Sequence, residues 1–167
     1  KLIVMLSVKY IPMQYYDAII IRFTGEDGGV HNIFVDGGDK KSRTICYTDK
    51  LKKELETLFG MGESIDLWVI THVDDDHIEG LYNFINDTKF FEAHHERINE
   101  VWMNYGGKGD YEVQRAGTIS YHGGKELRDL LNKKHISVTH DILFVHASTL
   151  SDASITVVVP YIYAMKR

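Results

Sequence analysis

The middle of the chain carries the apolar run Asp66-Leu67-Trp68-Val69-Ile70, followed directly by Thr71-His72-Val73-Asp74-Asp75-Asp76-His77-Ile78-Glu79-Gly80. The apolar run is short and bounded by polar residues, which is typical of a central strand buried on both faces. Beyond the acidic segment, apolar residues recur at helical spacing at Ile78, Leu81, Tyr82 and Ile85. The acidic, histidine-containing segment is therefore predicted to be a loop between a buried strand and a helix.

The flanking sequence predicts further strands, helices and turns. We expect strands at residues 2–8, 17–23, 31–35, 101–103, 142–145 and 155–159, and helices around residues 51–59 and 127–131. Residues 25–29 and 36–38 are predicted turns because glycine adopts positive φ without steric cost, and Gly60 is predicted to cap the first helix. Strands and helices alternate in the middle while hairpins dominate the ends, so residues 1–167 are predicted to form one mixed α/β layered domain.

The composition is typical of a globular domain and lacks the excess of basic residues expected of a nucleic-acid-binding surface. The 167 residues are 44% hydrophobic and 26% charged, and the net charge of −5 gives no broad basic surface for DNA or RNA. Cys46 is the only cysteine, so no disulfide can form within the chain. A reducing cytoplasmic setting is expected, although a secreted bacterial protein without disulfides would have the same cysteine content. The apolar opening at residues 2–6 is too short to span a membrane and lacks the arrangement of a signal peptide, so no membrane segment is expected.

The acidic loop contains four side chains of the kinds that bind metals, namely His72, Asp74, Asp76 and His77. Residues two apart in extended backbone point the same way, so the first two can converge on one ion, while the last two can serve a second ion at the turn into the helix. Gly80 would let the first helical turn pack close to neighbouring backbone. The residues alone leave another interpretation open, in which the three aspartates form a solvated turn and Asp75 or Asp76 caps the helix.

The segment from Thr71 to Gly80 resembles the signature of the metallo-β-lactamase superfamily, a strand-end Thr/Ser-His-x-His-x-Asp-His-x-x-Gly. Asp74 stands in the place of the second histidine, and the same His-x-Asp-x-Asp-His variant occurs in the domain attached to ComEC-like DNA-uptake proteins. Residues 17–23 and 32–38 also look like the first hairpins of that family. The resemblance implies that Asp36 does not bind the metal itself but contacts a ligand or the loop backbone and orients it. The residues alone are equally consistent with an aspartate that only forms the turn.

The resemblance implies an αββα sandwich, incomplete at its C-terminus, of which this chain covers the N-terminal half to two-thirds. It implies a hydrolase with two divalent metal ions, zinc or manganese, that uses a metal-activated water, which Asp76 orients or deprotonates. The carboxylate of Asp74 shifts the expected preference toward harder ions such as manganese. The ComEC-like variant suggests a phosphodiester substrate, and a small-molecule substrate remains open.

The family site also needs a downstream histidine, a bridging aspartate after a glycine, and a final histidine, which are not evident in this sequence. His122 is a candidate third ligand, or else a surface-loop residue, and His94 and His95 are expected to be solvated. The alternative to an enzyme is a catalytically inactive or incomplete binding module of the same fold. An apolar edge at residues 155–159 predicts either a homodimer or pairing with the missing C-terminal half.

Overall fold

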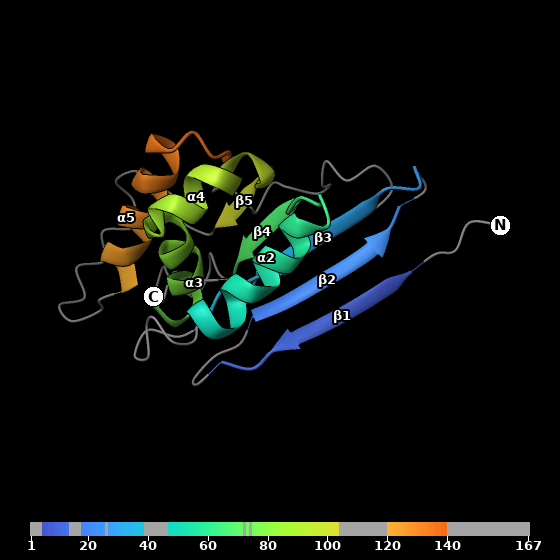
Figure 1. Cartoon of the computed structure of the whole chain (residues 1–167). Coiled ribbons are helices and arrows are strands. Elements are labelled where there is room, and N and C mark those ends of the chain that lie inside the picture. Colours follow the sequence, from blue (N-terminus) through green and yellow to red (C-terminus); the bar gives the residue numbers. More distant parts are fainter. Residues whose placement is uncertain are drawn as a thin grey trace.

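A computed structural model of the chain (Figure 1) describes residues 5–13, 18–25, 27–38, 47–71, 73, 75–103 and 120–139. These residues form a six-stranded sheet with four α-helices, so the predicted α/β class is confirmed at that level. The strands are β1 (Leu6–Ile11), β2 (Ala18–Thr24), β3 (Val30–Val35), β4 (Leu67–Ile70), β5 (Val101–Met103) and β6 (Val138–Thr139). The helices are η1 (Tyr47–Leu51), α2 (Lys52–Gly60), α3 (Asp75–Asn86), α4 (Thr88–His94), η2 (His95–Arg97) and α5 (Ser120–Lys133).

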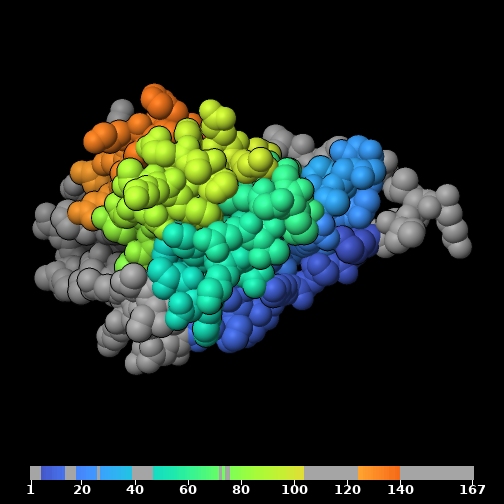
Figure 2. Space-filling view, in the orientation of Figure 1, coloured from blue at the N-terminus to red at the C-terminus, as the bar shows by residue number. Residues whose placement is uncertain are grey.

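The strands lie in the sheet in the order of the chain. β1, β2 and β3 pair antiparallel, and β3 to β6 pair parallel. The β2–β3 connection is the hairpin predicted at residues 25–29, in which Gly28 takes a φ of 77°. Each parallel step crosses over through helices, as parallel pairing requires. The buried hydrophobic residues of these helices all belong to one cluster, so the helices pack on the same face of the sheet. In Figure 2 the helical residues lie packed together, and the blue strands remain visible beside them.

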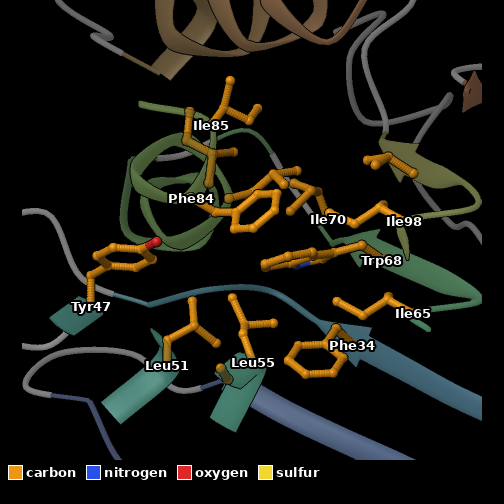
Figure 3. Close-up of a cluster of buried hydrophobic side chains, with 14 of the residues drawn as sticks. Phe34, Tyr47, Leu51, Leu55, Ile65, Trp68, Ile70, Phe84, Ile85 and Ile98 are labelled. Atoms are coloured by element: carbon orange, nitrogen blue, oxygen red, sulfur yellow. The ribbon is translucent and has the colours of Figure 1, made fainter. Parts of the chain in front are cut away.

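Trp68 of β4 lies at the centre of the core on the helical face. Its ring is 5.3 Å from that of Phe34 on β3 and 6.3 Å from that of Phe84 on α3, and Figure 3 shows the indole between the two. The opposite face of the sheet is also apolar, with Leu67 and Trp102 buried beside Ile33. β4 is therefore buried from both sides, as its uninterrupted apolar sequence predicted.

Several boundaries differ from the prediction. β1 extends past Val8 to Ile11 because its ladder with β2 continues to Ala18. The left-handed residue that ends α2 is Gly62 (φ 81°) rather than Gly60; the N–H of Gly62 donates to Phe59 O and that of Glu63 to Leu58 O. Residues 2–4, 142–145 and 155–159, where strand was also predicted, lie outside the described residues.

The expectation of solvated histidines at positions 94 and 95 is wrong. The ring of His94 stacks on Phe59 of α2 at 4.8 Å, and that of His95 stacks on Phe91 at 5.1 Å. Burial lowers the pKa of His94, and nearby Arg97 adds to that shift. The polar neighbours of these histidines suggested a solvated helix, but aromatic side chains next to them in space make both half-buried.

None of the helices in the described part of the chain is both long and apolar enough to cross a membrane. A cytoplasmic location remains a prediction.

A polar network holds the amino ends of β3 and β4 together. The fully buried Asn32 donates from its backbone to Asp66 Oδ2 at 2.8 Å and from its side chain to Glu63 Oε2 at 3.1 Å. Arg22 of β2 donates to both carboxylate oxygens of Glu63. The hydrogen bond from Arg22 lowers the pKa of Glu63, against the opposing effect of desolvation, and the hydrogen bond from Asn32 acts in the same direction.

This network predicts an acid-sensitive contribution to stability. Because the folded state lowers the pKa of Glu63, its contribution is present above the ordinary value of 4.5 and is lost as the pH falls through the lowered value. We expect Glu63→Gln to reduce the free energy of unfolding at neutral pH by about 1.5–3 kcal/mol, and the difference from wild type to shrink at about pH 3.5. Urea unfolding of the wild type and Glu63→Gln at neutral pH and at about pH 3.5 measures this difference in the free energy of unfolding.

The matched control is Glu92→Gln, which removes one partner of the exposed ion pair between Lys134 and Glu92. Exposed pairs contribute little, so this variant should unfold at the wild-type midpoint. A Glu63→Gln penalty that is the same at both pH values would contradict the assigned role of the carboxylate charge.

Candidate functional site

The predicted loop lies where β3 and β4 end side by side. Val35 is paired with Val69, and the backbone N–H of Asp36 donates to Val69 O at 2.8 Å. α3 then begins at Asp75, so the acidic segment runs from the carboxyl end of β4 into the first turn of a helix. The carboxyl ends of parallel strands are where α/β sheets usually place their ligand sites.

Asp36 has an unusual backbone conformation for a residue with a side chain. Its φ is 57°, in the left-handed region that aspartate tolerates better than most residues, at a cost of about 1 kcal/mol. Two hydrogen bonds hold it there, because the carbonyl of Asp36 accepts from the Trp68 indole N–H at 3.0 Å while its N–H is bound to Val69. The core tryptophan therefore fixes the start of the turn.

The buried carboxylate of Asp36 joins β4 to α3. Its Oδ1 accepts from the backbone N–H of Thr71 at 2.8 Å, and its Oδ2 accepts from the Thr71 hydroxyl at 2.7 Å. The same Oδ2 lies 2.9 Å from Nδ1 of the buried His77. A carboxylate can only accept, so Nδ1 carries the proton and, in the neutral ring, Nε2 keeps the lone pair that a metal would use. The position of Asp36 behind a predicted ligand is what the resemblance implied.

Gly37 and Gly80 bring the turn after β3 against the first turn of α3. A Cβ on Gly80 would lie 2.2 Å from Gly37 O, and a Cβ on Gly37 would lie 2.8 Å from Gly80 Cα. The predicted close approach of backbone at Gly80 is therefore confirmed. This contact places the first turn of α3, and with it His77, within reach of the Asp36 carboxylate.

Asp76 lies beside the outer nitrogen of this histidine. Its Oδ1 is 3.9 Å from Nε2 of His77, and its side chain is about three-quarters buried. α3 starts at Asp75, so neither Asp75 nor Asp76 is the helix N-cap that the solvated-turn interpretation assumed. Asp76 stands in the first helical turn, where negative charge is favourable with respect to the helix dipole.

The other two predicted ligands, His72 and Asp74, lie outside the described residues. Within the described ranges, no group of three or more His, Cys, Asp or Glu side chains is arranged to hold a metal ion. Asp76 and His77 are thus the part of the predicted ligand set whose positions are known. Convergence of all four side chains on metal ions stays a prediction.

α5 packs against the acidic loop. A Cβ on Gly124 would lie 2.7 Å from Cβ of Val73. His122, for which a surface loop was one expectation, belongs to α5, two residues before this contact. Its part as a third ligand stays a hypothesis.

Two residues of the site were not singled out from the sequence. Thr71 was recognised only as the first letter of the motif, yet it provides two of the hydrogen bonds to Asp36. Trp68 was recognised as a core residue, yet its indole N–H also fixes the turn. The place of Thr71 in the motif indicated that it belongs to the site. Nothing in the neighbouring sequence indicates the hydrogen bond from the Trp68 indole to Asp36 O.

The chain matches no family model and no curated protein. Membership of the metallo-β-lactamase superfamily therefore remains a prediction from the loop motif and the first hairpins.

The glycine contact makes a prediction about stability. Gly80→Ala forces a methyl group into the backbone of Gly37, and we expect the free energy of unfolding to fall by about 1–3 kcal/mol or more. Gly60→Ala is the matched control, because this helical glycine has nothing within 4 Å of its added Cβ. That change should stabilise the fold by about 0.5–1 kcal/mol. Chemical denaturation of both variants measures the two changes in the free energy of unfolding. Equal changes would contradict the close approach of Gly80 and Gly37.

Proposed function

We propose that this chain is a metal-dependent hydrolase of the metallo-β-lactamase type, with His72, Asp74, Asp76 and His77 as metal ligands. The observation that carries the proposal is the hydrogen bond from Nδ1 of His77 to the buried Asp36 carboxylate. Metal-binding histidines commonly donate their second ring nitrogen to a carboxylate in this way, which fixes the ring and raises the basicity of the metal-binding nitrogen.

The donor set fits divalent zinc or manganese. It combines imidazole nitrogen, which suits zinc, with two carboxylates, which suit harder ions such as manganese. The partly buried Asp76 carboxylate beside Nε2 of His77 is consistent with two neighbouring donors for such ions. We expect two ions, following the family resemblance.

Bound divalent ions would polarise the scissile group and lower the pKa of a water molecule to near 7. The residues of the chain have separate tasks. Asp36 and Thr71 contact Nδ1 of the His77 ring, so Nε2 is the nitrogen that would bind the metal ion. Asp76 would orient the attacking water and accept its proton at a carboxylate oxygen, which is the work of a general base.

We infer phosphodiesters as the substrate class, on the resemblance to the ComEC-like variant. The net charge of −5 means that the protein surface as a whole does not attract phosphates. The positive charge that a phosphodiester needs would therefore come from the bound ions themselves. A module that binds metal without turnover is the alternative, and a turnover measurement separates the two.

Metal binding gives the first test. We expect Mn²⁺ or Zn²⁺ to bind to the wild type and to raise its melting temperature by several degrees. His77→Ala should lose both the bound metal, measured by elemental analysis, and the upward shift. His95→Ala is the control, because it removes a half-buried histidine that stacks on Phe91 instead.

Hydrolysis of bis(p-nitrophenyl) phosphate by the metal-loaded wild type then distinguishes the two functions. Turnover that depends on His77 supports the hydrolase, while a metal-dependent melt without turnover supports the binding module. A wild-type melting temperature that no divalent ion changes would overturn the metal site.

Asp36→Asn tests whether the Asp36 carboxylate positions the predicted ligand His77. Asparagine tolerates a φ near 57° about as well as aspartate, so the turn should be kept while the negative charge that faces His77 Nδ1 is lost. We expect the affinity for Zn²⁺ to fall by about 10- to 100-fold. Competitive titration with a chromophoric chelator measures the affinity directly, without reliance on activity, and unchanged affinity would exclude a positioning role for Asp36.

A further inference from the structure

The edge strand β1 presents a row of exposed apolar side chains. Leu6, Val8 and Tyr10 are 69%, 65% and 58% exposed, whereas most apolar side chains of the described residues are buried. Among the described elements, β1 is the outermost strand of the sheet, as Figure 1 shows, and it pairs only with β2. The three side chains lie on the face away from α2, because the alternate residue Lys9 reaches Glu54 on that helix.

The hydrogen bonding of β1 shows which backbone groups point outward. The ladder pairs Leu6 with Phe23, and just before it Met5 O accepts from Thr24 N at 2.9 Å. In an antiparallel ladder such bonded positions alternate with positions whose N–H and C=O point away from the partner strand. Leu6 and Val8 are of the second kind. The residues that expose apolar side chains are thus the ones whose backbone faces outward.

Lys9, the lysine of β1, forms an ion pair within its own molecule. Lysines on edge strands commonly prevent strands of other molecules from pairing. The ammonium group of Lys9 lies 2.7 Å from both carboxylate oxygens of Glu54, on the helical side of the sheet. Its charge is therefore matched within the same molecule and directed away from the exposed apolar row.

We propose that β1 pairs antiparallel with β1 of a second copy of this chain, about a two-fold axis at Val8. This register sets Val8 opposite Val8 of the second copy with outward N–H and C=O groups facing each other. It sets Leu6 opposite Tyr10, an aliphatic–aromatic pair of the kind that stabilises sheets, and Ser7 opposite Lys9. Closed two-fold pairing also uses the same surface on both copies.

The proposed dimer is reversible and does not rest on the proposed function. A strand of six residues is roughly 20 Å long, and edge pairing of that length gives an interface at the small end of the range for stable dimers. Dissociation on dilution is therefore expected. The acidic loop lies beyond the ends of β3 and β4, two strands away in the sheet, so loss of the dimer would leave metal binding unchanged.

Sedimentation equilibrium of the metal-free chain tests the proposal. The wild type should show a monomer–dimer equilibrium. Val8→Lys should raise the dissociation constant by about tenfold or more, since it removes an apolar pair and sets two like charges opposite each other. Val8→Glu should do the same. An equimolar mixture of the two variants should recover dimer, because only a two-fold axis at Val8 brings position 8 against position 8.

Met61→Lys is the control, since it replaces another apolar side chain, 56% exposed, at the end of α2. Its dimerisation should equal that of the wild type. Circular dichroism checks that each variant is folded. A wild type that stays monomeric up to about 1 mM, a dimer that survives in both Val8 variants, or a mixture that stays monomeric would each overturn the proposal.

Discussion

The carboxylate of Asp36 is the interaction on which the site depends. It is buried, and it accepts hydrogen bonds from the N–H and hydroxyl of Thr71 and contacts Nδ1 of His77. One side chain at the end of β3 thereby fixes both the end of β4 and the first turn of α3. A buried carboxylate without these donors would be costly, so the three contacts stabilise one another.

Hydrophobic packing sets the position of that carboxylate. The Trp68 ring lies between Phe34 and Phe84 in the core, while its indole N–H donates to Asp36 O. The same tryptophan thus belongs to the core and to the polar site. Because interiors are close-packed, a shift of this ring would move the turn as well. The close backbone contact at Gly80 constrains the turn from its other side.

The sequence predicted local features well and contacts between distant segments poorly. The buried strand before the acidic loop and the helix after it follow from short-range periodicity, and both are present. The capping glycine after α2 was misassigned because Gly60 and Gly62 both suit a helix end, and only the backbone hydrogen bonds of the cap distinguish them. Asp36 was found through the family resemblance alone. It meets Thr71 and His77 across 35 and 41 residues of chain, and no local pattern encodes such a meeting.

Polar contacts at both ends of the β3–β4 pair explain why the site can be rigid. At the amino ends, Asn32 and Asp66 exchange two hydrogen bonds, from Asn32 N to Asp66 Oδ2 and from Asp66 N to Asn32 O. At the carboxyl ends, Asp36 N donates to Val69 O. A slip of one residue in this pairing would turn every β3 side chain to the opposite face. Asp36 would then lose Thr71 and His77 together, so the polar groups at the amino ends of β3 and β4 help to hold the histidine of the acidic loop in place.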